Sequence, residues 1–361
     1  MGCSDAPVLL GWNASDAGPG LDGSPAADAS EPVDATDSAA DADSGPGAQS
    51  CAVAGPGLSQ CGAAVETCCT SLDVAGGTYF RSYSNSGAGP IDEAAPATVS
   101  DFRLDKYLVT VGRFRRFVTA WNGGAGWTPP VGSGKHTHLN GGSGLNATSG
   151  GYEAGWNDAF NVNVAPTDTN LACTGTLESD ESPGSQYGTW TPTPGAQENL
   201  PITCANWYEA YAFCIWDSGF LASEAELEYA AAAGSEQREY PWGTTPPGTN
   251  NRYAIYQCNY PNGSGTCTGV VNIAPVGTAN LGAGMWGQLD LAGTVWEWTL
   301  DSYAAYVTPC TDCANVDALT QRSTQGGNFN TDTLHFAPSR HPNNPADKGA
   351  YAYGFRCART P

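Results

Sequence analysis

Glycine and proline set the strongest limit on what this chain can fold into. Its 361 residues include 46 glycines and 25 prolines, about a fifth of the sequence. Glycine weakens helix interiors and proline breaks them, so this content excludes a helical bundle or a coiled coil. Eleven tryptophans and sixteen tyrosines still supply enough apolar surface for a core. We therefore expect a loop-rich domain with little regular secondary structure.

The acidic residues are concentrated at the start of the chain. The formal net charge is −22, and the first basic residue is Arg81, whereas residues 1–80 hold eleven acidic side chains. Residues 13–50 consist almost entirely of Ala, Asp, Ser, Gly and Pro, which cannot bury enough surface to offset their ordering entropy. We expect residues 1–50 to hold a disordered acidic linker, and we expect no nucleic acid partner, because its phosphates would repel this charge.

The first four residues, Met1-Gly2-Cys3-Ser4, resemble the mature start of a bacterial lipoprotein with a lipidated Cys3. The alternative is that Cys3 is an incidental thiol. The sequence contains no run of about 18 apolar residues, so we expect no transmembrane helix and membrane contact only through a lipid anchor. These features predict an extracytoplasmic protein of the cell envelope.

Thirteen cysteines indicate an oxidising compartment, in which disulfides persist. The count is odd, so at least one cysteine does not pair within the chain. Residues 51–75 form a small Cys-rich segment with Cys51, Cys61, Cys68 and Cys69. Four cysteines also suit a zinc site, but two adjacent ones are poorly placed for tetrahedral chelation, so we expect disulfides.

Three helices are predicted in the remaining sequence. Residues 110–120 begin with a capping Thr110 and carry apolar residues at helical spacing. Residues 207–216 place aromatic and small residues on one face. Residues 223–233 open with Ser223 followed by Glu226, a capping box. Residues 122–200, rich in Gly, Asn, Ser and Thr, are expected to form long irregular loops.

Eight phrases in order resemble the sulfatase-modifying-factor family, whose founding member is the formylglycine-generating enzyme. They begin at residue 76 and extend to the end of the chain; the phrases are 76–80, 102–110, 201–210, 221–231, 240–243 with 274–277, 290–299, 326–329 and 354–357. The resemblance implies one α+β domain over residues 76–361, formylglycine-generating-enzyme-like and distantly C-type-lectin-like, loop-rich and low in regular secondary structure.

The resemblance does not extend to the family's catalytic pair. It implies an oxidase that binds copper through two cysteines shortly after the Gly326-Gly327 phrase, because soft sulfur selects Cu(I). Those positions are Thr331 and Phe336 here, and no cysteine lies between Cys313 and Cys357. We therefore predict that copper is not bound there, that copper-dependent formylglycine generation is absent and that no catalytic residue of this mechanism remains.

A structural calcium site is implied by the phrase at 290–299. The family's ligands match the side chains of Asp290 and Glu297 and the main-chain carbonyls of Gly293 and Val295. Hard oxygen ligands of this kind suit calcium. The alternative is a core strand with one solvated Glu297, but a glutamate between two tryptophans is costly to bury without compensation.

The resemblance also implies a disulfide between Cys214 and Cys357 and a groove lined by Asn328 and Arg340. Local pairs Cys258–Cys267 and Cys310–Cys313 are further expectations, which leave Cys173 to pair with Cys204.

Four histidines offer a second hypothesis about metal chemistry. His136 and His138 are two residues apart, and His335 and His341 flank the position of the missing second thiol. Together they would suit a transition metal such as copper, zinc or iron. The alternative is solvated or hydrogen-bonded loop histidines.

The leading hypothesis is an exported, tethered family domain that binds a peptide or a glycan or serves as a scaffold. A divergent oxidase that uses the histidines in place of the cysteines is the alternative. A purely structural surface-coat role is a third possibility.

Overall fold

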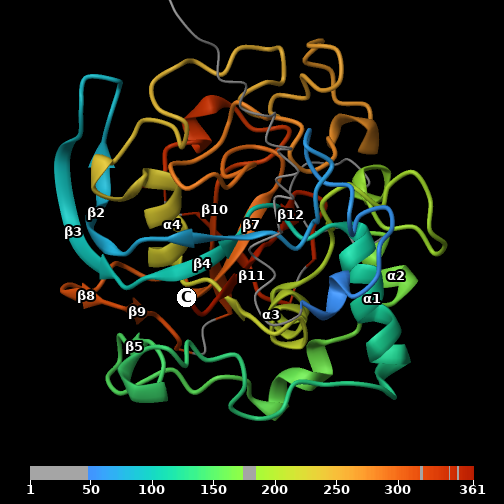
Figure 1. Ribbon diagram of the computed structural model, residues 1–361, viewed down its shortest axis with the longest axis horizontal. Coiled ribbons are helices and arrows are strands. Elements are labelled where there is room, and N and C mark those ends of the chain that lie inside the picture. The colour runs from blue at the N-terminus through green and yellow to red at the C-terminus, as the bar shows by residue number, and fades with distance from the viewer. Residues whose placement is uncertain (1–47, 174–183, 318–319, 341, 348) are drawn as a thin grey trace, which may run out of the picture. The chain divides into compact units, whose positions relative to one another are not determined.

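The computed structural model describes residues 48–173, 184–317, 320–340, 342–347 and 349–361 (Figure 1). Almost all of the predicted acidic linker, including Cys3, lies outside these residues. The described residues form a mixed α/β domain in which short helices and strands are separated by long loops, as the glycine and proline content predicts. None of the helices in the described residues has the length and apolarity to cross a membrane.

The three predicted helices are present, and side-chain caps begin each of them. The Thr110 hydroxyl accepts a hydrogen bond from the Arg113 backbone at the start of α1 (Val111–Trp121). Asn206 with Glu209 and Ser223 with Glu226 form capping boxes at the starts of α3 (Trp207–Trp216) and α4 (Glu224–Ala232). A further short helix, α2 (Asp168–Leu171), lies in the predicted loop region.

Thirteen short strands among the described residues form four small sheets. The first sheet has the order β1 (Ser71–Val74), β4 (Phe102–Asp105), β13 (Cys357–Arg359) and β6 (Phe220–Leu221). The second has the order β11 (Asn343–Pro345), β10 (Gln321–Gln325), β7 (Trp296–Ser302) and β12 (Tyr353–Gly354). The third joins β2 (Gly77–Ser84), β3 (Ile91–Val99) and β8 (Cys310–Thr311), and the last pairs β5 (Asn146–Ala147) with β9 (Cys313–Ala314). The long β2–β3 hairpin is visible in Figure 1.

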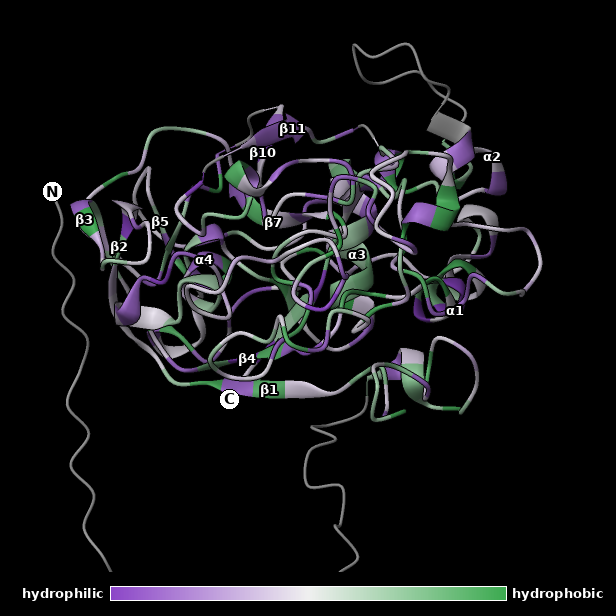
Figure 2. Cartoon of the chain, turned by 90° about the horizontal axis from the view of Figure 1, so that it is seen from above, coloured by the Kyte–Doolittle hydropathy of each residue, from purple (hydrophilic) through white to green (hydrophobic). Residues whose placement is uncertain are grey.

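Helix α3 lies in the largest hydrophobic cluster. Figure 2 shows it mainly in the colours of apolar residues, whereas α1 also carries hydrophilic ones. Phe213 packs against Phe114 and Phe117 of α1, with ring centroids 5.7 and 5.9 Å apart, and against Phe355 at 5.5 Å. A helix buried on this many sides needs apolar residues around most of its circumference, which explains the run of aromatic and small residues in its sequence.

Six disulfides are present, and four of them, 173–204, 214–357, 258–267 and 310–313, are the pairs expected from the sequence. All twelve cysteines in the described residues are bonded, in the pairs 51–69, 61–68, 173–204, 214–357, 258–267 and 310–313. The predicted bond between Cys214 and Cys357 joins α3 to β13 and closes a loop of 143 residues. In the chain-entropy description, such a loop is worth roughly 4–5 kcal/mol.

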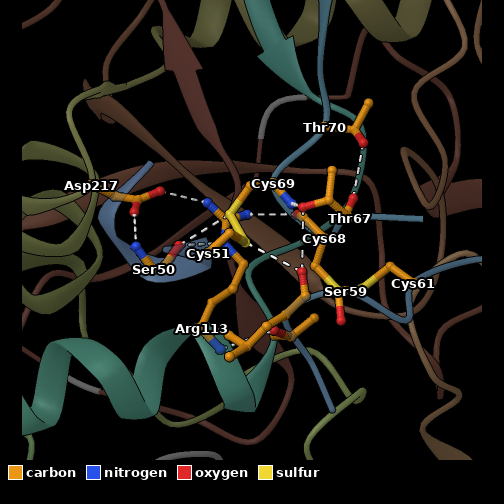
Figure 3. The surroundings of a disulfide bond; sticks show 12 residues. Ser50, Cys51, Ser59, Cys61, Thr67, Cys68, Cys69, Thr70, Arg113 and Asp217 are labelled. Carbon is orange, nitrogen blue, oxygen red and sulfur yellow. Dashed lines mark hydrogen bonds and ion pairs between the residues drawn. A yellow bond between two sulfur atoms is a disulfide. The ribbon is translucent and has the colours of Figure 1, made fainter. Parts of the chain in front are cut away.

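The Cys-rich segment at 51–75 packs closely on the rest of the domain (Figure 3). Its last residues form β1, which pairs antiparallel with β4. The backbone N–H of Ser50 donates to the Asp217 carboxylate at 2.7 Å, and Arg113 donates to Ser50 Oγ and to the Cys68 carbonyl. This segment is therefore part of the same folded unit.

Beside that contact lies a buried ion-pair network of Asp105, Arg113, Asp217 and Arg359. Arg113 contacts Asp105 at 3.0 Å and Asp217 at 2.7 Å, and Arg359 contacts the same two carboxylates at 3.0 and 2.8 Å. All four side chains are buried. Burial by itself would raise the pKa of Asp217, but Arg113 and Arg359 hold it below its ordinary value.

Arg113→Met should strongly destabilise the protein. Removing one partner of a buried charge pair leaves the other charges uncompensated, and such changes cost about 3–5 kcal/mol. Chemical denaturation with the disulfides intact measures this loss. Arg116→Met, at an exposed position of the same helix, should change stability by no more than about 0.5 kcal/mol. Equal losses in the two variants would show that the network contributes nothing specific.

Candidate functional site

The position predicted for the second family thiol is Phe336, whose aromatic side chain lies in the interior. Phe336 is 1% exposed and belongs to an apolar cluster with Ala254, Tyr256 and Ala292. Its ring lies 5.3 Å from that of Tyr256 and 6.4 Å from that of Trp242. Close-packed rings therefore surround the predicted position of the second thiol.

Thr331, at the position predicted for the first thiol, is part of a tight turn. The Thr331 hydroxyl donates to the Asn328 carbonyl and accepts from the Asn328 backbone N–H, both at 3.0 Å. Gly327 has φ +76°, and a Cβ there would lie 3.2 Å from Thr331, His335 and Phe336, so the turn favours glycine. The Asn328 amide oxygen accepts from the backbone of Thr331 as well. These bonds stabilise the turn and provide no sulfur.

The cysteines elsewhere do not replace the missing pair. Every cysteine in the described residues is in a disulfide, and a disulfide sulfur is not a thiolate. The two predicted groove residues differ in exposure: Asn328 is buried in the turn, whereas Arg340 is exposed.

The four histidines fall into different environments. His335 is half-buried, its Nδ1 lies 2.8 Å from Asp332 Oδ1, and its ring stands 5.6 Å from that of Trp296. His136 and His138 lie side by side against Phe220, with their ring centroids 6.2 Å apart. His341 lies outside the described residues.

His136 is held between two carboxylates. Its Nδ1 lies 3.0 Å from Glu153, and its Nε2 lies 3.1 Å from Glu226 of α4. Burial disfavours the charged ring, but Glu226 and Glu153 outweigh it and raise the pKa of His136 to about 10. The imidazolium therefore clamps the 136–153 loop to α4. Both ring nitrogens are engaged, which leaves neither for a metal in this conformation.

His138 differs from its neighbour in having two buried ring nitrogens with no hydrogen-bond partner. Burial lowers its pKa. Across the described residues, no three His, Cys, Asp or Glu side chains assemble into a group that could hold a metal. The structure thus brings two of the predicted histidines together and places His335 in a separate setting.

The guanidinium of Arg356 lies against the predicted calcium loop and binds Glu297. Both oxygens of Glu297 accept from Arg356, at 2.7 and 2.9 Å, and both side chains are buried. Asp290 Oδ2 accepts from the Gly277 backbone, and Asp290 Oδ1 is buried without a partner. The Gly293 carbonyl accepts from the backbone N–H of Val295.

The positive charge of Arg356 compensates the buried negative charge of Glu297. The two residues are 59 positions apart, and no sequence pattern linked them. Both oxygens of Glu297 bind Arg356, so the four predicted ligands do not fit calcium as a set in this conformation. Among their carboxylate oxygens, Asp290 Oδ1 has no hydrogen-bond partner. Calcium binding at this loop stays a prediction.

A cavity of about 310 Å³ lies at another place in the domain. Its walls come from the loop around residues 147–160, from α3, from β7 and β10, and from residues 316–317. Four aromatic side chains line it: Tyr152, Phe160, Trp207 and Tyr211. Arg322 of β10 lines it too. No sequence motif points to this cavity, because its lining residues are spread from Ala147 to Arg322.

The chain is similar to known proteins over most of its length. A family model described as a sulfatase-modifying factor enzyme 1-like domain matches residues 61–361. The formylglycine-generating enzyme of Thermomonospora curvata is 28% identical over 317 residues, covering 80% of this chain and 92% of that protein. The inactive Cα-formylglycine-generating enzyme 2 of Bos taurus is 36% identical over 117 residues, covering 32% of this chain and 38% of that protein.

Among solved structures, PvdO from Pseudomonas aeruginosa aligns with a TM-score of 0.47 at 17% identity, covering 81% of this chain and 94% of that one. The Treponema denticola variable protein 1 aligns with a TM-score of 0.45 at 16% identity, covering 81% of this chain and 98% of that one.

Two buried carboxyl groups outside these sites are poised near neutrality. Burial raises the pKa of Glu209, in the first turn of α3, to about 7 although two backbone N–H groups bind it. Burial and the neighbouring Glu224 raise the pKa of Asp301 in β7 to about 7. Both groups ordinarily titrate near pH 4. The native state therefore holds protons between about pH 4 and pH 7 that the unfolded chain releases.

Stability should fall as the pH rises through that window, because stability decreases with pH wherever the native state binds more protons. We expect the melting temperature to be roughly 5 °C lower at pH 8 than at pH 5, since each pKa unit is worth about 1.4 kcal/mol. Calorimetry across this range measures the slope. Glu209→Gln should flatten it, and Asp73→Asn, at a side chain that is 85% exposed, should not. A melting temperature that rises from pH 5 to pH 8 would contradict the assignment.

Proposed function

The chain belongs to the sulfatase-modifying factor enzyme 1-like domain family, and we propose that it is a member without copper-dependent formylglycine-generating activity that serves as a peptide- or glycan-binding module. The fold is shared with the family. Copper-dependent oxidation depends on two thiols, and Thr331 and Phe336 stand at their predicted positions.

The burial of Phe336 is the observation that carries the proposal. Cu(I) requires soft sulfur or nitrogen ligands, and a phenyl ring offers none. A copper ion at this position would have to displace a ring packed against Tyr256 and Trp242. Thr331 offers only a hydroxyl that the turn already uses. The first step of the family chemistry, the capture of copper by two thiolates, therefore has no residues to perform it.

Similar proteins include both an enzyme and an inactive form. The matched proteins include one named a formylglycine-generating enzyme and one named an inactive form of such an enzyme. Loss of activity in a recognisable member therefore has a parallel among the proteins that resemble this chain.

A binding role is supported by the cavity beside α3. Binding sites for small ligands are concave, mostly apolar and equipped with a few polar groups, and the aromatic walls with Arg322 have this character. None of its lining residues belongs to the turn at 326–336, so a ligand there would not depend on thiols at positions 331 and 336.

The six disulfides indicate an oxidising, extracellular type of environment. We propose in addition that Cys3 carries a lipid and that the acidic residues after it act as a tether. A flexible tether of this composition would hold the domain away from an anionic membrane surface.

The alternative, an oxidase that uses His136, His138, His335 and His341, remains a prediction. The engagement of His136 with Glu153 and Glu226 counts against it, because a metal would have to replace two charged hydrogen bonds. Elemental analysis that finds stoichiometric copper or iron, lost on His335→Ala, would support the alternative over the proposal.

The purified protein should produce no aldehyde in a peptide that carries the sulfatase cysteine motif, in the presence of copper and oxygen. Mass spectrometry of the peptide is the measurement, and the Thermomonospora curvata enzyme is the positive control. Thr331→Ala and Phe336→Leu should also give no aldehyde. Formylglycine formation by the unmodified protein at a rate near that of the control enzyme would refute the proposal.

A further inference from the structure

Arg322 presents a buried positive charge to the cavity without a carboxylate partner. The side chain is 4% exposed, its Nη1 donates to the Leu300 carbonyl at 3.1 Å, and its Nε is buried without any hydrogen-bond partner. Burial lowers the pKa of its guanidinium to about 10. A buried charge in this state is costly unless something else neutralises it.

Three other buried arginines in this protein have direct carboxylate partners. Arg113, Arg356 and Arg359 each contact at least one buried carboxylate at 3.0 Å or less. Arg322 instead lies over the Trp207 ring, with its Cζ 3.7 Å from the ring centroid. A cation–π contact of this kind returns only part of what a carboxylate provides.

The nearby carboxylates are committed elsewhere. The two oxygens of Asp301 accept from the backbones of Glu224 and Asn315, both at 2.7 Å. Glu153, on the cavity wall, binds His136 and the backbone of Leu145. Asp317 lines the cavity as well, but its side chain is exposed and is free to turn to water. The negative charge of Asp301 offsets part of the effect of burial on the Arg322 pKa, but the oxygens of Asp301 are taken up by backbone N–H groups and do not pair directly with the guanidinium.

The aromatic residues that line the cavity suit a ligand with a flat ring. Trp207 is fixed by the bond from its Nε1 to the Thr299 carbonyl, and its ring packs at 5.3 Å from Tyr211 and 5.9 Å from Phe160. Tyr152 is 51% exposed. Aromatic faces of this kind stack against sugar rings and aromatic side chains.

We propose that this cavity binds a small carboxylate-bearing ligand, whose carboxylate pairs with Arg322 and whose ring-sized body packs against Trp207, Tyr211 and Phe160. The guanidinium suits a carboxylate because N–H···O bonds between opposite charges are strong, and Arg322 lines the cavity wall. A volume of about 310 Å³ accommodates one ring with its substituents. The inference rests on the proposed binding role and names its ligand class.

Two sources could provide this chemistry: a uronic acid unit of a glycan and the C-terminal aromatic residue of a peptide. Glucuronate and N-acetylphenylalanine are the corresponding probes. Glucose and N-acetylphenylalanine amide are their uncharged counterparts. Titration calorimetry of the full chain at pH 7 measures each affinity, and the acid that binds more tightly identifies the source.

At least one acid should bind, and its uncharged counterpart should bind at least tenfold more weakly. Arg322→Gln should weaken the acid at least tenfold. Arg252→Gln removes the same charge at an exposed position outside the cavity and should leave the affinity unchanged. Ala154→Trp, at an exposed lining position, should also weaken binding by narrowing the cavity, and it keeps the test valid if Arg322→Gln does not fold.

Three results would overturn the inference: no binding of either acid at millimolar concentration, equal binding of acid and uncharged probe, or full affinity in a folded Arg322→Gln protein. These results are separate from the peptide oxidation assay. Aldehyde formation with intact acid binding would refute only the absence of catalysis, and absence of both would refute only the ligand site.

Discussion

The buried ion-pair network of Asp105, Arg113, Asp217 and Arg359 is the constraint on which the rest of the domain depends. It joins β4, α1, the end of α3 and β13 at one point, and Ser50 brings the Cys-rich segment to the same point. Two positive and two negative charges can stay buried only while all four are in place. A loop-rich chain with few long helices or strands gains a defined arrangement from such a requirement.

The same rule, that a buried charge must meet its opposite, accounts for the other internal ionic contacts. Glu297 meets Arg356, and His136 meets Glu153 and Glu226. Charged residues are only 14% of the sequence, so each of these buried contacts uses a scarce kind of side chain. Against this background, Arg322 stands out because its positive charge faces a cavity instead of a carboxylate.

Local features of the fold could be predicted from the sequence, and long-range contacts could not. Thr110, Asn206 and Ser223 mark helix starts because capping is decided within three residues. The pairing of Cys214 with Cys357 came from the family resemblance. Glu226 and His136 are 90 residues apart, and Glu297 and Arg356 are 59 apart, so no spacing rule connects them. The calcium prediction used Glu297 without its partner for this reason, and the cavity was missed because five separate segments line it.

The proposed absence of the two family thiols is physically compatible with retention of the fold. Phe336 adds apolar surface to a cluster with Tyr256 and Trp242, so the change from thiol to ring is compatible with a well-packed interior. The ion-pair network and the disulfides that hold the domain together lie on other residues, and none of them needs copper. The stability of the domain therefore does not depend on oxidation chemistry, and the proposed binding role relies on residues outside 331–336. The cavity formed by the 147–160 loop, α3 and β10 meets that condition, because the contacts of Arg322 and Trp207 do not involve Thr331 or Phe336.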